Sequence, residues 1–193
     1  MKIVIIDYGA GNVQSVKYAF DRLGYDAKIT DDYEKIRSAD KVIFPGVGEA
    51  SSAMKALKIK KLDILIPNLK QPVLGICLGM QMMCKFSEEG NTDGMGIFDL
   101  QVKRFRKGLK VPQIGWNQIE NLKTDLFNEI SEREYMYLVH SYYVEDNKDA
   151  IATSRYGLTY ATAIQKDNFY GVQFHPEKSS DAGETLLNNF LKM

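Results

Sequence analysis

Residues 72–79 read Pro-Val-Leu-Gly-Ile-Cys-Leu-Gly, and this stretch says more about the fold than any other. Its apolar residues form a short continuous run, which is typical of a strand buried on both faces of a parallel sheet. The strand ends in Gly75-Ile76-Cys77-Leu78-Gly79, with a helical pattern following. A Gly-x-nucleophile-x-Gly sequence between a strand and a helix is the pattern of a nucleophile elbow, whose sharp turn leaves room only for glycine at both flanking positions. We therefore expect an α/β fold with Cys77 as its nucleophile.

The same alternation of strands and helices extends outward from this stretch through the first half of the chain. Strands are expected at 3–6, 27–30, 41–44 and 72–76, and helices at 13–23, 34–39, 50–57, 62–69 and 78–86. This order predicts a parallel sheet covered on both faces. Later segments at 101–105, 116–120, 135–143, 150–154, 159–165 and 169–174 predict added antiparallel strands, and 184–193 a closing helix. Without a linker or repeat, residues 1–193 are expected to form a single domain.

The composition narrows the class of protein. Of the 193 residues, 45% are hydrophobic and 26% are charged, which is typical of a globular chain. Lys and Arg number 25, as do Asp and Glu, so binding to nucleic acid or to an anionic membrane by bulk charge is not expected. No apolar run reaches the roughly 18–20 residues of a membrane span, and the short apolar start is no signal peptide. A cytoplasmic location is the expectation.

Few side chains are available for metal binding or acid–base catalysis. The two Cys and two His, at positions 77, 84, 140 and 175, match no zinc-ligand spacing and make no disulfide framework. We also expect no nucleotide cofactor, because the glycine-rich segment at 7–12 lacks the third glycine of a dinucleotide fingerprint, with Gln14 in its place.

The chemistry at Cys77 follows from its place before a helix. Free N–H groups and the positive end of the helix dipole favour a thiolate there, and the Leu78 N–H is a candidate oxyanion donor. The alternative interpretation is a buried cysteine that only packs. Cys84 lies among Met and Phe residues in the predicted helix and is expected to belong to the core.

A thiol nucleophile needs a base, and the segment Gln173-Phe174-His175-Pro176-Glu177 offers one. Residues two apart in an extended chain face the same side, so Glu177 is expected to bind one imidazole nitrogen while the other faces the sulfur. The alternative is a loop histidine beside a solvated glutamate. His140 has no acidic residue at the equivalent spacing, which favours a structural role. Glycines in 45–48 also predict a backbone anion nest after the third strand.

Three motifs together, Pro45–Gly48, Gly75–Gln81 and His175–Glu177, resemble those of the class I (triad) glutamine amidotransferases. Further segments at 7–12, 87–90, 115–117, 140–142 and 174–179 extend the resemblance over nearly the whole chain. It implies a three-layer, flavodoxin-like fold. It also implies that Cys77 attacks the side-chain amide of glutamine, and that His175 protonates the departing ammonia and then activates water.

The resemblance assigns further roles by position. The oxyanion donors are the N–H groups of Leu78 and Val47, the latter after a peptide flip that couples activity to a partner. The residues that bind glutamine are Gly46, Gly48, Gln81, Glu89, Ser141 and Tyr142, with the Glu89 carboxylate suited to the α-ammonium. Trp116, Asn117, Tyr137 and Lys178 are expected to face the partner or the ammonia path, the alternative being ordinary core or surface.

The expected partner is a separate (β/α)-barrel cyclase subunit, in a heterodimer of histidine biosynthesis that shields ammonia from becoming ammonium. One departure is Pro112-Gln113-Ile114, where the family commonly has His in the middle position. This keeps a second acceptor open, because paralogues supply ammonia for amidination of surface sugars. Two other functions are kept as alternatives. A stand-alone cysteine hydrolase would be fully active without a partner. In a non-catalytic regulatory subunit, an electrophile that mimics glutamine would not label Cys77.

Overall fold

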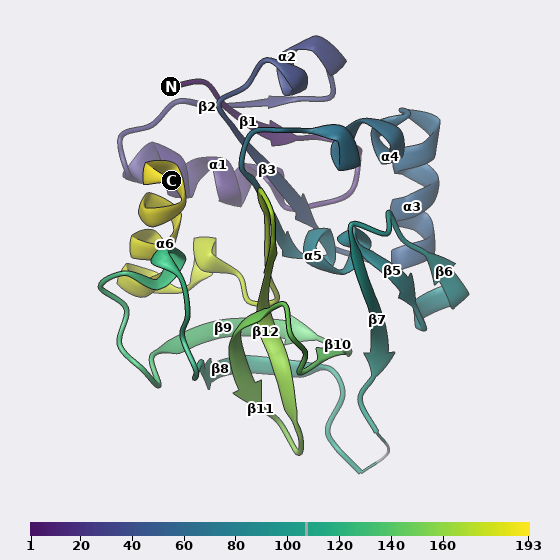
Figure 1. Ribbon diagram of the computed structural model, residues 1–193, viewed down its shortest axis with the longest axis vertical. Coiled ribbons are helices and arrows are strands. Elements are labelled where there is room, and N and C mark those ends of the chain that lie inside the picture. The colour runs from purple at the N-terminus through teal and green to yellow at the C-terminus, as the bar shows by residue number, and fades with distance from the viewer. Residues whose placement is uncertain (107) are drawn as a thin grey trace.

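A mixed sheet runs through the protein, with helices on both faces (Figure 1). The computed structural model describes residues 1–106 and 108–193. Within them the sheet has the strand order β2-β1-β3-β4-β13-β12-β10-β7-β5-β6, and β11 pairs with β12. The strands are β1 (Ile3–Ile6), β2 (Ala27–Thr30), β3 (Lys41–Gly46), β4 (Val73–Cys77), β5 (Cys84–Ser87), β6 (Thr92–Asp93), β7 (Phe98–Arg104), β10 (Tyr142–Glu145), β11 (Ala150–Arg155), β12 (Thr159–Lys166) and β13 (Phe169–Val172).

The strands of the first half pair in parallel, as the sequence predicts. β1 pairs with β2 and β3, and β4 pairs with β3 and β13, all in parallel. The antiparallel additions are the pairs β12–β13, β10–β12, β11–β12, β7–β10 and β5–β6. The expectation of purely antiparallel additions is wrong for β7, which also pairs with β5 in parallel. The carboxyl ends of β3 and β4 therefore lie side by side, with Gly46 opposite Cys77.

Two apolar cores cover the two faces of the sheet. In β1, Val4 and Ile6 belong to one core, and Ile3 and Ile5 to the other, as the alternation of side chains along a strand requires. The first core includes residues of α3 (Ala50–Ile59), α4 (Leu62–Leu65) and α5 (Leu78–Met83), and the second includes residues of α1 (Val13–Arg22) and α6 (Ser180–Lys192). In Figure 1, α1 and α6 lie to the left and α3 and α4 to the right.

Helix α1 illustrates how the sequence sets its elements. The Asn12 side chain accepts a hydrogen bond from the Ser15 N–H at 3.3 Å and caps the helix. Val16 and Phe20 are buried one turn apart, and Gly24 follows with a φ of +82°, the left-handed conformation that commonly ends a helix. The remaining elements are α2 (Tyr33–Arg37) and the 3₁₀ turns η1 (Ile66–Asn68), η2 (Glu89–Asn91), η3 (Asp125–Phe127) and η4 (Pro176–Lys178).

The strand expected over 135–143 is wrong as a single element. It divides at Ser141 into β9 (Tyr135–His140) and β10, and β9 pairs with β8 (Gln113–Gln118) in a separate two-stranded sheet. The Ser141 carbonyl accepts a hydrogen bond from the Phe105 N–H at 3.1 Å. The chain therefore changes sheets at Ser141, beside the carboxyl ends of β3 and β4.

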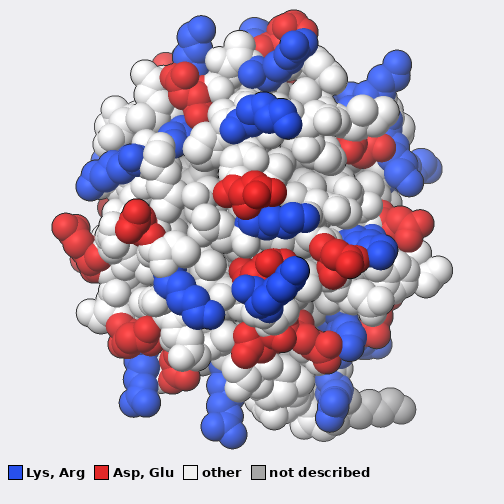
Figure 2. All heavy atoms as spheres, viewed as in Figure 1, with Lys and Arg blue, Asp and Glu red and all other residues white. Residues whose placement is uncertain are grey.

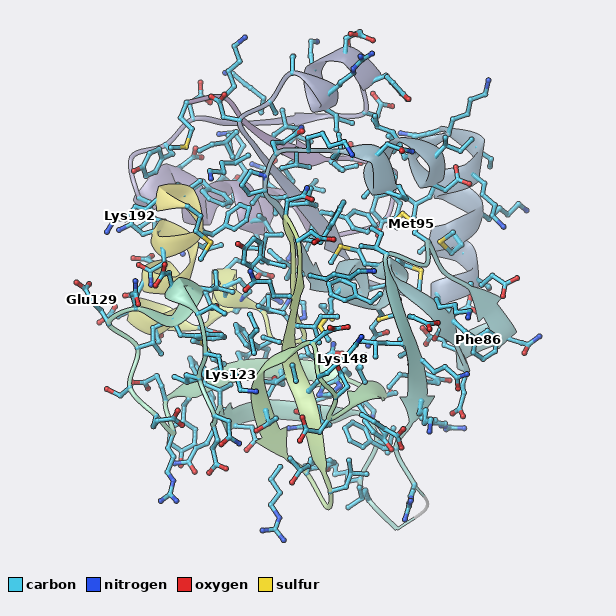
Figure 3. The ribbon with its side chains drawn as sticks, viewed as in Figure 1. Phe86, Met95, Lys123, Glu129, Lys148 and Lys192 are labelled. Carbon is cyan, nitrogen blue, oxygen red and sulfur yellow. The ribbon has the colours of Figure 1, made fainter. Side chains whose placement is uncertain are left out.

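The helix expected over 78–86 ends earlier, at Met83, and Cys84 begins β5. The carbonyls of Met82 and Cys84 accept hydrogen bonds from the N–H groups of Met95 and Gly96, at 2.8 and 3.2 Å. These carbonyls would otherwise bond within a continuing helix, so the neighbouring segment ends it. Figure 3 labels Met95 and, on β5 near the edge of the molecule, Phe86.

Charged groups of both signs are interspersed over the face in Figure 2, as expected for equal numbers of acidic and basic residues. Of the described helices, none has the length and apolar character to cross a membrane.

Candidate active site

Cys77 stands on a strained turn between β4 and α5. Its backbone has φ 54° and ψ −112°, a conformation that costs a non-glycine residue of order 1–3 kcal/mol and is concentrated at functional sites. The residue caps the amino end of α5 and is 7% exposed. The sulfur is thus held at the point where the free N–H groups of the helix gather.

The two flanking glycines are required by close backbone contacts. A Cβ at Gly79 would lie 1.9 Å from the carbonyl oxygen of Phe44, on the adjacent strand β3. At Gly75 it would lie 2.4 Å from the Met83 methyl group and 2.9 Å from the Met80 nitrogen. No side chain fits at these distances, which is the crowding that the Gly-x-Cys-x-Gly pattern predicts.

His175 and Glu177 form a buried pair behind the sulfur. His175 Nδ1 and Glu177 Oε1 are 2.8 Å apart. The expected geometry is wrong in one respect: the pair is joined across the 3₁₀ turn η4 and not along an extended chain. Ser179 Oγ donates to the His175 carbonyl at 2.7 Å and accepts from the Tyr137 N–H at 3.0 Å. The backbone at His175 is therefore tied to β9 through Ser179, while Glu177 orients the imidazole.

The surroundings of His175 favour its charged form. Burial on its own would lower the imidazole pKa, but the hydrogen bonds and negative charges of Cys77 and Glu177 together outweigh it and raise the pKa to about 10. Because Nδ1 is engaged by the carboxylate, Nε2 is the nitrogen available to the sulfur. The arrangement supports a thiolate–imidazolium pair, which combines a nucleophile with a proton donor.

A cavity of about 350 Å³ opens over the cysteine, a size in the range of small-molecule sites. It is lined by Val47, Gly48, Cys77, Leu78, Gln81, Glu89, Pro112, Val139, His140, Ser141, Tyr142, His175 and Lys178. Most residues predicted for the site are thus brought together from five separate segments. Of the others, Glu177 lies behind His175, Gly46 lies opposite Cys77 in β3, and Trp116, Asn117 and Tyr137 are not among the lining residues.

Two predicted substrate-binding side chains are held by internal hydrogen bonds. Gln81 Nε2 donates to the Tyr142 carbonyl at 3.2 Å and to Gln173 Oε1 at 2.8 Å, which leaves its own carbonyl oxygen for a ligand. Glu89 Oε2 accepts from the Ala50 N–H at 2.9 Å, and burial raises the pKa of this carboxyl group. The cavity therefore offers one carboxylate and one amide oxygen to a cationic group.

His140 is held neutral beneath the cavity. Its Nδ1 lies 2.7 Å from the Tyr142 carbonyl, so Nδ1 carries the proton and donates. Nε2 is then the acceptor of the neutral ring, and it faces the Tyr160 hydroxyl at 3.3 Å and the side-chain amide of Gln113 at 3.0 Å. Burial lowers the pKa of His140 to about 4, and the neighbouring His175 adds to the shift. This agrees with the structural role expected from the sequence.

Cys84 belongs to the core, as expected. Its side chain is fully buried, its thiol lies 3.7 Å from the Met80 carbonyl, and burial raises the thiol pKa to about 12.

In the described part of the chain, no group of three or more His, Cys, Asp or Glu side chains could hold a metal ion.

The residues predicted to face a partner divide between the two faces of β8. Trp116 is 51% exposed, and its ring packs edge-on against that of Tyr137 with the ring centroids 5.9 Å apart. Ile114 is also exposed on that face. Asn117 lies on the opposite face and donates to the Arg155 carbonyl at 3.0 Å. Lys178 lies at the cavity. The structure therefore groups Trp116 with Tyr137 and separates Asn117 from them.

Two polar residues at the site are absent from the sequence prediction. Gln173 is fully buried, and its Nε2 lies 3.7 Å from the sulfur of Cys77. Ser179 links His175 to Tyr137. A signal for Gln173 exists in the sequence, because it stands two residues before His175 in an extended segment and so faces the same side.

Comparisons with known proteins agree with this geometry. A family model for class-I glutamine amidotransferases matches residues 4–193. The chain is 54% identical over 196 residues to the Bacteroides fragilis (strain YCH46) imidazole glycerol phosphate synthase subunit HisH, with 100% of both chains covered. It is 50% identical over 194 residues to the subunit of the same name from Haemophilus influenzae (strain ATCC 51907 / DSM 11121 / KW20 / Rd), covering 100% of this chain and 98% of the other.

A solved structure of a glutamine amidotransferase has the same fold. It superposes with a TM-score of 0.77 at 19% identity, covering 98% of this chain and 97% of that one. The α/β fold with a mostly parallel sheet, expected from the sequence, is confirmed.

Proposed function

The chain belongs to the class I glutamine amidotransferases, and from this premise we propose that it is the glutaminase subunit of imidazole glycerol phosphate synthase, in histidine biosynthesis. The observation that carries the proposal is the strained Cys77 facing the buried His175–Glu177 pair at the base of a cavity. The relatives named as subunits of that synthase support the choice of pathway.

Glutamine binds with its side-chain amide over the sulfur. The Glu89 carboxylate and the free oxygen of Gln81 suit its α-ammonium group, since both are acceptors. Backbone groups of Gly48, Ser141 and Tyr142 complete the lining. These groups include side chains from α5 and η2 and backbone from the junction of β9 and β10, so the clamp depends on the bend at Ser141.

The first half of the reaction transfers the glutamyl group to the sulfur. The Cys77 thiolate attacks the amide carbon, and the N–H groups of Leu78 and Val47 stabilise the resulting oxyanion. His175 gives its Nε2 proton to the amide nitrogen as the carbon–nitrogen bond breaks, which releases ammonia and leaves a thioester. Glu177 holds the imidazolium through Nδ1 during this step.

The second half restores the enzyme. Neutral His175 takes a proton from water as the water oxygen attacks the thioester carbon. The carbon–sulfur bond then breaks, glutamate leaves, and the Cys77 thiolate and the His175 imidazolium are regenerated.

The ammonia is used by a second chain, a cyclase subunit with a (β/α)-barrel fold, in a heterodimer. Free ammonia takes up a proton at neutral pH and loses its nucleophilicity, so a shielded route to the acceptor is needed. The exposed apolar face of β8 and β9, formed by Ile114, Trp116, Tyr135 and Tyr137, is the surface that we assign to this partner. Its aromatic content suits an interface core.

A cytoplasmic location is part of the same proposal. Both cysteines are free, and a chain without disulfides suits the reducing cytosol.

The test is glutamate release from glutamine, measured with and without a cyclase subunit and its ligand. We expect low activity alone and a large increase with the cyclase of histidine biosynthesis. Cys77→Ala should abolish the activity, whereas Cys84→Ala, the matched control, should retain it.

Three outcomes would contradict the proposal. Full activity without a partner would indicate a stand-alone hydrolase. Stimulation only by an amidating partner for surface sugars would assign a different acceptor. Equal activity in Cys77→Ala would exclude the proposed chemistry.

A further inference from the structure

A chain of hydrogen bonds between buried amide groups ends on the sulfur of Cys77. Gln81 Nε2 donates to the Tyr142 carbonyl at 3.2 Å and to Gln173 Oε1 at 2.8 Å. Gln173 Nε2 then lies 3.7 Å from Cys77 Sγ, within hydrogen-bonding distance for sulfur. Gln173 is fully buried, so water does not compete for its amide, and Gln81 is 4% exposed.

The direction of every amide in this chain follows from donor and acceptor chemistry. The Tyr142 carbonyl can only accept, so the Gln81 atom that faces it is the NH₂ nitrogen. That nitrogen can only donate, so the Gln173 atom beside it is the oxygen. The Gln173 NH₂ group is left facing the sulfur. His140 Nδ1 also donates to the Tyr142 carbonyl, at 2.7 Å, which holds the first member in place.

The sulfur has two opposed polar contacts. One is the Gln173 amide, which donates to the sulfur, and the other is the Val139 carbonyl oxygen, an acceptor that lies 3.8 Å from the sulfur. A thiol can donate its proton to that carbonyl, whereas a thiolate is repelled by it and is stabilised by an N–H donor. The two contacts therefore favour different protonation states, and Gln173 favours the reactive one.

Glu89, His140 and Lys178 line the same cavity as Cys77, and two further ionisable groups interact with the sulfur itself. His175, followed by η4, pairs with the sulfur and is backed by Glu177. Tyr8, which follows β1, is buried and interacts with the cysteine charge, and both effects raise its pKa. Tyr8 is therefore neutral at physiological pH, so Gln173 acts beside His175 and the amino end of α5 as a neutral donor.

We propose that Gln173 is a thiolate-stabilising residue, whose side-chain amide donates to Cys77 Sγ and is held in that orientation by Gln81 and the Tyr142 carbonyl. The role concerns the nucleophile of the proposed function. The role of Gln173 is tested by alkylation of Cys77, without glutamine or a partner. A negative result there would overturn this role and would leave the proposed glutaminase function to its own test.

The experiment is the pH dependence of Cys77 alkylation by iodoacetamide, in a Cys84→Ala background. Gln173→Met keeps the length of the side chain and removes the donor. We expect the midpoint of the alkylation profile to move to higher pH, and the rate below that midpoint to fall about tenfold, the size of a hydrogen bond to a charged group. At high pH, where the thiolate is fully formed in both proteins, the rates should converge.

Two further variants complete the test. Gln173→Asn keeps a polar amide for folding but withdraws it from the sulfur, so it should shift the midpoint in the same direction. Gln165→Met removes an amide on β12 that bonds to the Tyr170 hydroxyl and not to the site, and should leave the profile unchanged. Unchanged midpoints in both Gln173 variants would overturn the proposal. A uniform fall in rate at every pH would also overturn it, because it indicates loss of structure or access.

Discussion

Replacing His140 by Asn should reduce the decrease in the free energy of unfolding of the protein in mild acid. The imidazole is buried and its pKa is lowered to about 4, whereas in the unfolded chain it is about 6.5. Between these values the unfolded state binds a proton that the folded state does not, so stability falls as the pH is lowered. An Asn at 140 keeps a donor near the Tyr142 carbonyl, which His140 Nδ1 contacts at 2.7 Å, but it cannot titrate.

The magnitude follows from the two pKa values. Linkage gives a loss of about 2 kcal/mol at pH 5 and about 3 kcal/mol at pH 4, relative to neutral pH. With a urea m-value of about 2 kcal/mol/M, the pH 5 loss moves the unfolding midpoint by about 1 M. All other ionisable groups are shared by the two proteins, so they cancel in the difference.

The assay is urea unfolding followed by circular dichroism at several values between pH 7.5 and pH 4. The free energy of unfolding of the wild-type protein should fall more steeply than that of His140→Asn, and the difference should reach about 2 kcal/mol at pH 5. The variant can be less stable at every pH, because it loses ring contacts. Parallel curves for the two proteins would refute a neutral, buried His140.

Three further predictions concern the elbow, the second cysteine and the carboxylate behind the catalytic base. Gly79→Ala would place a methyl carbon 1.9 Å from the Phe44 carbonyl oxygen. It should therefore lower the stability by about 1–3 kcal/mol, measured by calorimetry, and abolish glutaminase activity, measured by glutamate release. An unchanged Tm would contradict the packing. Cys84 should resist iodoacetamide in the folded protein, because it is fully buried and its pKa is about 12; peptide mapping that finds it labelled would contradict this. Glu177→Gln should lower activity about a hundredfold or more, since it removes a charge that supports the His175 imidazolium; wild-type activity would contradict that role.

The parallel half of the fold is predictable because its signals are local. The run Ile3–Ile6 is apolar at every position, which identifies a strand with both faces buried, and the structure places its residues alternately in two cores. The glycines around Cys77 mark a turn that no larger residue can make. In each case the constraint acts within a few residues of the pattern that reveals it.

The features that sequence reasoning misses depend on distant partners. The bend at Ser141 is set by a hydrogen bond from Phe105, and the end of α5 by hydrogen bonds from Met95 and Gly96. No local pattern encodes either one. The first affects the site, since it positions the substrate-binding backbone, and the second determines that Cys84 begins β5 in the core.

The candidate site shows the same division. Cys77, His175 and Glu177 can be chosen from their spacing and residue types. The hydrogen bond from Gln173 to the sulfur cannot, because its direction is decided by the Tyr142 carbonyl through Gln81. Polar networks of this kind are read only once the separate segments are placed together.

Cys77 is tested as the nucleophile by identifying the residue that a diazoketone analogue of glutamine modifies. The protein, bound to its cyclase partner, is treated with the analogue, and the adduct is located by mass spectrometry of its peptides. We expect one adduct per chain, on Cys77, with excess glutamine slowing its formation. An adduct on any other residue, or no adduct while glutamate is still released, would contradict it.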